Sequence, residues 1–344
     1  MRPSFHPRLV NGPFDDPGLF IPFLFEKRAF LFDLGDNHAL SSRDILKTSH
    51  VFVSHTHMDH FVGFDRLLRL CLGRNKTLFL YGPEGFLSNV EGKLSGYCWN
   101  LVSSYENRFA LDVTEVRRDH LLRKRFFCQD GFTPPADVQQ GPFNGMLLAE
   151  PALSVKTEIL DHNTPCLGFS LEERFHVNII KENLDGLGLT IGPWLGEFKE
   201  ALYNGGDPRS EFIIRSNDGG KEEKFELDDL AGKISMITPG QKIAYIADVG
   251  YSKGNIKKIL RLARDSDHLF IEGAFLDEER GHAKEKCHLT AMQAGTLAGM
   301  ARAKQFTLFH FSPRYTGMDS MLREEAQKAW EDSRAVGGSH IHNE

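Results

Sequence analysis

The segment 52–63, FVSHTHMDHFVG, concentrates side chains that bind metal ions. His55, His57, Asp59 and His60 fall within six positions, directly after an apolar run. Alternate residues of a strand share a face, so His55 and His57 point the same way, and a turn after them can bring Asp59 and His60 to the same point. Imidazole and carboxylate groups are ligands of zinc and similar divalent metals. If ligands also come from elsewhere, four such groups exceed one ion's share, which indicates two adjacent metals.

Three more candidate ligands each follow an apolar run further along the chain. His162 comes after SVKTEILD, Asp248 after KIAYIA and His310 after QFTLF. Each stands where a buried strand would emerge at a loop. A lone histidine in such a place is more simply explained as a structural residue with its hydrogen bonds satisfied. Together, the three favour ligation of the same metals as the cluster at 55–60.

The elements that must position these residues alternate between strands and helices. Short apolar runs bounded by Gly, Pro or charge are typical of buried strands, and they occupy 20–26, 29–35, 50–55, 77–83, 152–162, 166–173, 242–250, 268–275 and 305–312. Helical spacing occurs in 61–72 and 289–303, and Gly and Pro break the helical pieces of 178–206. The alternation predicts an α/β fold built in layers.

Composition narrows the class of protein. The 344 residues are 41% hydrophobic, and we find no apolar stretch long enough to cross a bilayer. Residues 1–18 lack the apolar region of a secretory signal, so we expect no membrane partner. Five scattered cysteines without a CxxC pair argue against a disulfide framework and favour a cytoplasmic location.

The net charge of the chain does not indicate nucleic-acid binding. The net charge is −6 and the pI is about 6.2, whereas nucleic-acid-binding proteins normally show a basic footprint. The strongest local exception is the basic run RRDHLLRKR at 117–125. We interpret it as a solvated helix face or loop, with an RNA-contacting patch as the alternative.

Several motifs together resemble one protein family. HTHMDH matches the HxHxDH signature of the metallo-β-lactamase fold, and the downstream series resembles its ribonuclease Z branch, the tRNA 3′-processing endonucleases. The segments that carry this resemblance are LDHNTPCLGFSLEE, IAYIADVGYS, FIEGAF with CHLTAMQAG, and LFHFSPRY. The resemblance implies a four-layer αβ/βα sandwich. It also implies a single domain over 1–344, with an insertion at about 92–150 and a reduced exosite-arm-like segment at about 178–206.

The same resemblance implies the ligand set and the catalytic residues. One zinc ion would be held by His55, His57 and His162, the other by Asp59, His60 and His310, with Asp248 between them. Mn or Fe can use the same ligands. Asp33 matches a strand-end position that supports a ligand histidine through a hydrogen bond. The family also implies a homodimer.

Catalysis by such a site uses further residues. Two metals can bind and deprotonate a water and stabilise charge at phosphorus, and Asp59 can orient that water. His288 resembles the residue that protonates the leaving ribose oxygen, and Glu272 the carboxylate that orients it. From the residues alone, a capping role for Glu272 and a structural one for His288 stay open. Arg314 is assigned to substrate phosphate, with a carboxylate partner as the alternative.

Two departures from the family pattern concern RNA recognition. Ribonuclease Z carries a Pro-x-x-x-Arg-Asn segment near its start, but the matching LVNGPFDDPGLFIPF has two aspartates, Asp15 and Asp16, and no Arg-Asn pair. The family's arm is lysine-rich, whereas acids balance bases in 178–206. Both changes weaken binding to a tRNA backbone.

We therefore predict an enzyme, a dinuclear metal-dependent phosphodiester hydrolase that uses a metal-bound hydroxide. Its substrate would be the 3′ end of pre-tRNA or a smaller phosphodiester. One alternative is another hydrolase of this fold acting on a thioester, lactone or sulfate ester, against which the CHLTA and HFSPRY segments count. A second is a non-catalytic binding protein on the same fold, against which the intact ligand set counts.

Overall fold

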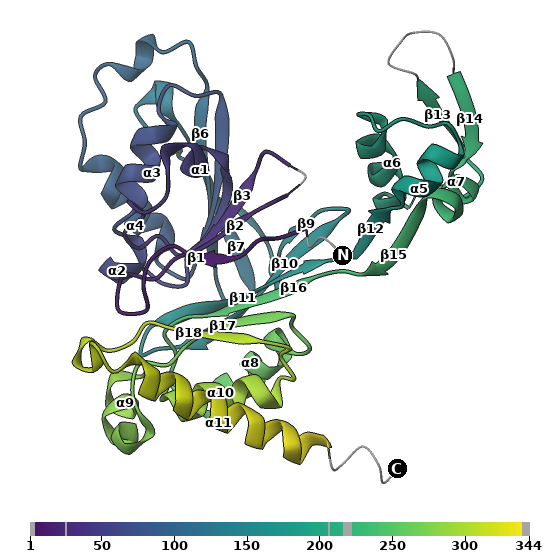
Figure 1. Cartoon of the computed structure of the whole chain (residues 1–344). Coiled ribbons are helices and arrows are strands. Elements are labelled where there is room, and N and C mark those ends of the chain that lie inside the picture. Colours follow the sequence, from purple (N-terminus) through teal and green to yellow (C-terminus); the bar gives the residue numbers. More distant parts are fainter. Residues whose placement is uncertain (1–3, 25, 206, 216–221, 339–344) are drawn as a thin grey trace. The chain divides into compact units, whose positions relative to one another are not determined.

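The computed structural model describes residues 4–24, 26–205, 207–215 and 222–338 (Figure 1). The chain divides into two compact units. The core unit comprises Phe5–Leu147, Lys156–Ser170 and Lys242–Glu344, and the small unit comprises Met1–Ser4, Leu148–Val155 and Leu171–Gln241. The expectation of a single domain, with an insertion at 92–150 and an arm at 178–206, stays a prediction, and residue 206 lies outside the described part.

The first sheet of the core unit contains eight strands in sequence order. They are β1 (Arg8–Leu9), β2 (Leu19–Pro22), β3 (Ala29–Phe32), β4 (Thr48–Phe52), β5 (Lys76–Gly82), β6 (Phe109–Val116), β7 (His120–Phe127) and β8 (Gln139–Pro142). The central strands β3 to β6 are parallel, and the flanking pairs are antiparallel. The central strands are rich in Phe, Leu and Val because such strands are covered on both faces.

Helices cover one face of this sheet (Figure 1). They are α1 (Ser42–Lys47), α3 (Phe64–Cys71) and α4 (Phe86–Ser95), while the short α2 (Met58–Phe61) follows β4. Leu67 and Leu68 of α3 and Phe86 of α4 are buried in the same apolar cluster as the strand residues Leu31 and Val51. The apolar spacing of 61–72 therefore reflects burial against the sheet, although α2 and α3 divide that segment.

The second sheet has the strand order β18-β17-β16-β11-β10-β9. Its strands are β9 (Met146–Ala149), β10 (Leu153–Asp161), β11 (Pro165–Glu173), β16 (Lys242–Ile246), β17 (His268–Glu272) and β18 (Phe306–Phe309). Strands β16, β17 and β18 are parallel, so their carboxyl ends meet at one edge of the sheet. This edge is where the candidate residues Asp248, Glu272 and His310 lie.

Helices also cover the outer face of the second sheet. They are α8 (Lys253–Ala263), α10 (Ala291–Met300) and α11 (Asp319–Gly338), with α9 (Arg280–Lys286) beside them. Helix α10 begins with a capping box, in which Thr290 and Gln293 bond reciprocally to each other's backbone. The predicted helix at 289–303 is thus confirmed in its central part.

Aromatic side chains join the inner faces of the two sheets. Phe169 of β11 lies 5.5 Å from Phe32 and 5.8 Å from Phe52 between ring centroids. Tyr245 of β16 lies 5.9 Å from Phe32. With helices outside both sheets, the layers run helix, sheet, sheet, helix, which confirms the predicted αβ/βα sandwich. Within the described residues, no helix is long and apolar enough to cross a membrane.

The basic run at 117–125 forms neither a helix face nor a loop, because most of it is strand β7, paired to β6. Several of its cations face carboxylates of the same unit. Lys124 Nζ lies 2.7 Å from Glu91 Oε1, and Arg123 and Arg125 lie 3.5 and 3.9 Å from the Asp112 carboxylate. The many charged residues of this run obscured the alternation of a strand. Lys124 and Phe126 point to one side of it, and Arg123 and Arg125 point to the other.

The small unit has its own apolar core. Its elements are β12 (Phe175–Ile179), α5 (Lys181–Gly186), α6 (Trp194–Tyr203), β13 (Glu211–Arg215), β14 (Glu222–Glu226), α7 (Leu227–Ile234) and β15 (Ser235–Pro239). Strand β12 pairs with β15, and β13 pairs with β14, both antiparallel. Trp194 is buried beside Phe198 and donates its indole N–H to the Thr190 carbonyl, so it is a packing anchor.

Candidate metal centre

The segment after β4 delivers four of the candidate ligands. His55 is buried, and His57 follows in extended backbone as the N-cap residue of α2, with φ −61° and ψ 155°. Asp59 and His60 lie within the single turn of that helix. The turn expected from the sequence is therefore the start of a short helix, and it brings the His55 and His60 rings to 4.1 Å between centroids.

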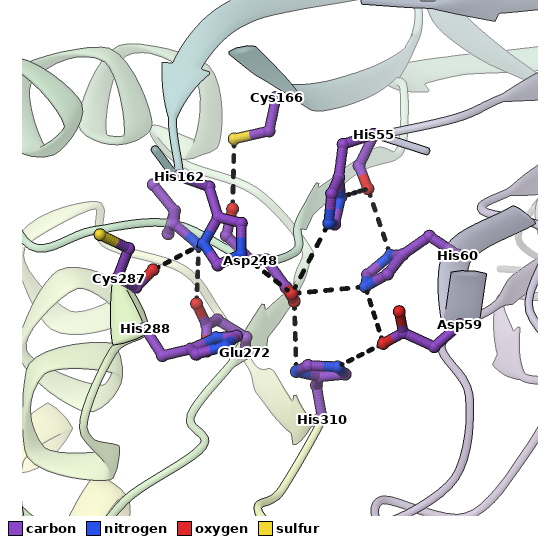
Figure 2. Close-up of polar contacts among 12 residues, drawn as sticks. His55, Asp59, His60, His162, Cys166, Asp248, Glu272, Cys287, His288 and His310 are labelled. Carbon is purple, nitrogen blue, oxygen red and sulfur yellow. Dashed lines mark hydrogen bonds and ion pairs between the residues drawn. The ribbon is translucent and has the colours of Figure 1, made fainter. Parts of the chain in front are cut away.

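The seven predicted ligands lie close together at the ends of strands of both sheets. Figure 2 labels all of them except His57. Within each of three groups, the potential ligand atoms all lie within 4.8 Å of one another. The groups are His55, His57, His162 and Asp248; Asp59, His60 and His310; and Asp248, Glu272, His288 and His310. The first two groups, taken together, contain the same residues as the predicted set.

Asp248 lies between the histidines of both groups. Its Oδ2 is 3.4 Å from His60 Nε2 and 3.6 Å from His162 Nε2. The same oxygen is 3.8 Å from His55 Nε2, and Oδ1 is 3.2 Å from His310 Nδ1. Oδ2 thus faces histidines of both groups and Oδ1 faces His310, so this one carboxylate is placed to be shared by the two groups.

Several buried polar atoms of this site have no hydrogen-bond partner among the described residues. They are His55 Nε2, His60 Nε2, Asp248 Oδ1 and His310 Nδ1. An unpaired buried polar group costs about 1–3 kcal/mol, so such atoms persist where something else satisfies them. Imidazole nitrogens and carboxylate oxygens that converge on a common centre suit divalent metals. The residues present therefore fit two metal ions.

The protonation states of His55, Asp59 and Asp248 suit ligation, whereas at His60 burial is outweighed by the carboxylates of Asp248 and Asp33, which raise the pKa of His60 above its usual range. Burial, reinforced by the neighbouring His60, lowers the pKa of His55 to about 2, so this imidazole is neutral. Burial opposes ionisation of Asp59, but the hydrogen bond from His310 and the charges of His60 and His310 together outweigh it and lower the pKa of Asp59 to about 2. Despite burial, His310 and His60 hold the pKa of Asp248 well below its usual range. Neutral histidines and ionised carboxylates are the forms that bind metals.

Asp33, at the end of β3, supports the site from behind. Its Oδ2 lies 2.9 Å from His60 Nδ1 and accepts the Tyr245 hydroxyl at 2.9 Å. It also accepts the backbone N–H of Ser54 at 2.6 Å and the Ser54 hydroxyl at 2.8 Å. Because the carboxylate can only accept, His60 donates from Nδ1 and turns Nε2 toward the metal groups.

His288 and Glu272 form a pair on the other side of the centre. His288 Nδ1 lies 3.0 Å from Glu272 Oε2, and Glu272 is fully buried at the end of β17. Burial lowers the pKa of His288, but the Glu272 carboxylate outweighs it and raises that pKa to about 9. Glu272 also accepts the Val249 N–H at 2.7 Å, which fixes its orientation. Neither residue is therefore a surface group.

The structure adds residues that the sequence did not single out. The backbone carbonyl of Cys287 lies 2.8 Å from His162 Nδ1, so this ring donates from Nδ1 and points Nε2 at Asp248. The Cys166 thiol donates to the Asp248 carbonyl at 3.1 Å. No side-chain pattern could have revealed the Cys287 contact, because a backbone atom makes it.

Backbone strain gathers around the same centre. Asp33, Asn163, Cys287 and His310 all have left-handed φ values, between 57° and 60°. Non-glycine residues in this region cost on the order of 1 kcal/mol or more each, and they tend to cluster at functional sites. Each of the four is itself a residue of the site or lies next to one in sequence or by contact.

Arg314 lies beside this site but is engaged elsewhere. Its guanidinium pairs with Glu279 and lies over the Phe275 ring, 5.5 Å from the centroid. Glu279 also accepts the Tyr315 hydroxyl. The geometry matches the carboxylate alternative, and the assignment of Arg314 to substrate phosphate stays a prediction.

A pocket opens beside the metal groups. It has a volume of about 370 Å³ and is reached by Asp59, His288 and His310. Its other walls include Phe14, Asp15, Asp16, Phe275, His282, Lys286, Phe311 and Ser312. Ligand-sized space next to a cluster of candidate metal ligands is the usual arrangement of an active site.

Solved structures with a similar fold define the class of protein. The metallo-β-lactamase-fold protein YhfI from Bacillus subtilis has a TM-score of 0.53 and 16% identity, with 95% of this chain and 94% of that chain covered. Human short-form tRNase Z has a TM-score of 0.50 and 18% identity, with 91% and 93% covered. The chain is thus a member of the metallo-β-lactamase fold class.

Curated relatives define the family within that class. "Ribonuclease Z" of Deinococcus radiodurans is 30% identical, with 85% of this chain and 86% of the relative covered. "Ribonuclease Z" of Methanosarcina mazei is 31% identical, with 88% and 84% covered. No family model matches the chain. The chain belongs to the ribonuclease Z family, whose members are metal-dependent phosphodiester hydrolases.

Proposed function

We propose that the seven converging residues hold two divalent metals for phosphodiester hydrolysis. His55, His57 and His162 hold one metal and Asp59, His60 and His310 the other, with Asp248 shared. The observation that carries this assignment is the set of buried nitrogen and oxygen atoms without a hydrogen-bond partner among the described residues. Zinc is the expected metal, because histidine and carboxylate ligands suit it, with Mn or Fe as alternatives.

Metals bound there would supply a water of lowered pKa and positive charge near the phosphoryl oxygens. The protein's own groups do the rest. His288 faces the pocket and donates a proton from Nε2 to the leaving oxygen, because its Nδ1 is committed to Glu272. Glu272 is held by the Val249 N–H and keeps the imidazole oriented. Asp59, fixed by His310 at 3.2 Å, is placed to orient the attacking water.

For the substrate, we infer an RNA 3′ end or a smaller phosphodiester. Membership in the ribonuclease Z family supports RNA, and the relatives' name states that activity for them. The aspartates at 15 and 16, in place of an Arg-Asn segment, favour a smaller substrate. Family membership also supports a homodimer and a cytoplasmic location.

A side-by-side assay tests this function. Metal-loaded protein is given a precursor tRNA with a 3′ trailer and, separately, bis(4-nitrophenyl) phosphate at low salt. Chelator-treated protein is the control. We expect metal-dependent hydrolysis of at least the small diester, and cleavage of the tRNA after its discriminator base would establish the endonuclease. Turnover of neither, with metals bound, would contradict the proposal and return thioesters, lactones, sulfate esters or a binding role to consideration.

A further inference from the structure

The pocket beside the metal centre limits what can lie next to the scissile phosphate. Its volume of about 370 Å³ is near the lower end of the roughly 300–1,000 Å³ seen for ligand pockets. Asp59, His288 and His310 form its metal-side wall. A group bound here lies beside the candidate metal ligands, and the space suits one nucleoside.

Two walls of the pocket are aromatic. Phe14 and Phe311 meet edge to face, with centroids 5.4 Å apart. Phe275 lies 6.1 Å from the His288 ring and 5.2 Å from the His282 ring. Flat aromatic surfaces favour a planar partner, and base stacking on such rings is sequence-tolerant. These walls suit a nucleobase.

The polar residues of the pocket have opposite charges. Lys286 is exposed at the end of α9, and no carboxylate of the described residues lies within ion-pair distance of its amine. Asp15 is also exposed, and its Oδ2 accepts the Gly12 N–H at 3.2 Å. Asp16 differs from Asp15 in being half-buried, and its Oδ2 accepts the Asp36 N–H at 3.0 Å. Lys286 and Asp15 are thus the charged groups open to a ligand.

We propose that this pocket binds the single nucleoside next to the scissile phosphate, with Lys286 binding that phosphate and Asp15 opposing any further phosphate. The inference rests on the proposed hydrolase function. A carboxylate accepts hydrogen bonds from ribose hydroxyls but repels a second anion, so the pocket favours a short diester or a chain end. Asp15 and Lys286 are then specificity-determining residues.

The charge of the small unit agrees with this selectivity. In 171–241, 14 Asp and Glu stand against 8 Lys and Arg, which accounts for the whole net charge of −6. Binding to a nucleic-acid backbone draws its strength from cations that replace counterions. Because acidic residues outnumber basic ones in the small unit, its net charge provides no electrostatic attraction for the backbone of a long RNA.

The test compares three substrates on metal-loaded full-length protein: bis(4-nitrophenyl) phosphate, a dinucleoside monophosphate and a homopolymeric oligoribonucleotide. Lys286→Ala should raise KM for the dinucleoside monophosphate about tenfold and change kcat by less than threefold. Lys284→Ala, an exposed lysine of the same helix outside the pocket, is the matched control. Binding of a nucleoside monophosphate, measured by calorimetry, should weaken in parallel.

Asp15 is tested through the ratio of kcat/KM for the oligoribonucleotide to that for the dinucleoside monophosphate. Asp15→Asn should raise this ratio about threefold and Asp15→Lys about tenfold, and added salt should shrink both gains. Asp332→Lys makes the same charge change on α11 and should leave the ratio unchanged. An unchanged ratio in Asp15→Lys, or equal effects of Lys284→Ala and Lys286→Ala, overturns the inference. Failure of wild-type protein to hydrolyse any of the three substrates overturns the proposed function instead.

Discussion

The core unit and the small unit differ in the balance of their charges and in the kind of interaction that they can support. In the core unit, every candidate ligand converges on one centre, and acids and bases outside 171–241 cancel. The small unit folds around its own apolar core but carries the entire net negative charge. In the core unit the chemistry depends on a few residues at fixed distances. In the small unit any binding depends on summed charge, which substitutions change gradually.

The largest effect should come from the core unit's shared carboxylate. Asp248→Ala should lower hydrolysis at least about a thousandfold, because it removes the group between both metal sites. Metal content, measured by mass spectrometry, should fall by at least half. Chelator-treated variant and wild type should unfold at similar temperatures, since the carboxylate has no metal to bind there. Asp161→Ala, an exposed neighbour, is the control, and full activity of Asp248→Ala would refute the ligand assignment.

His288→Ala should slow hydrolysis by a factor that depends on the leaving group. For a ribonucleoside leaving group the loss should be about 10²–10⁴-fold, because protonation of the oxygen is then required. For 4-nitrophenol, a weakly basic leaving group, it should be much smaller. Bound metal should stay constant, and loss of metal would mean that His288 is a ligand. His120→Ala, at a half-buried histidine of β7 outside the site, controls for general effects.

Asp33→Asn should weaken metal binding without removing a ligand. Loss of the negative partner frees His60 to change tautomer, and such changes typically cost 10–100-fold in metal affinity. Competition with a chromophoric chelator measures the metal affinity of the variant and of the wild type. Asp36→Asn, an exposed aspartate nearby, should leave affinity within twofold, and equal effects of the two would remove Asp33 from the site.

Charge reversal in each unit should change the affinity for tRNA by different amounts, with differences of a few-fold. Glu200→Lys with Glu223→Lys places two cations on the small unit, and Glu324→Lys with Asp332→Lys places two on the core unit's α11. If the small unit contacts RNA, the first pair should raise tRNA affinity about three- to tenfold at low salt, and the second pair less. Fluorescence anisotropy gives the Kd values. Equal gains would show that only net charge matters.

The smallest effect concerns acid stability of the core unit. Burial lowers the pKa of His268 from 6.5 to about 4, so its neutral form is preferred in the folded state. Its contribution is fully present above pH 6.5 and is lost as pH falls from 6.5 toward 4, by about 1–2 kcal/mol after allowance for partial exposure. In chelator-treated protein, His268→Gln should reduce the change of the free energy of unfolding between pH 6.5 and pH 4, measured by denaturant titration. An unchanged pH slope would contradict the assignment.

The sequence predicted which residues come together because the candidate ligands stand at strand ends. The four candidate ligands of HTHMDH are brought together by a local turn. Asp248 and His310 follow parallel strands whose carboxyl ends lie at the same edge of the sheet. The Glu272–His288 pair could be assigned only by resemblance, since Nδ1 of one helix-entry histidine and a carboxylate 16 positions away meet through tertiary packing. The Cys287 carbonyl, the Lys286 amine and strand β7 were missed, because backbone contacts, pocket walls and charge-rich strands leave no periodic signal.

The ligands come from both sheets, with His55, His57, Asp59 and His60 after β4 and the other three after β10, β16 and β18. If these residues hold two metals as proposed, a chain whose sheets are not docked offers only part of each site, and both ions bind only to the folded sandwich. Metal binding then shifts the equilibrium away from unfolded chains. In a cell short of metal, more of this protein would be open to proteases, so its abundance would follow metal supply.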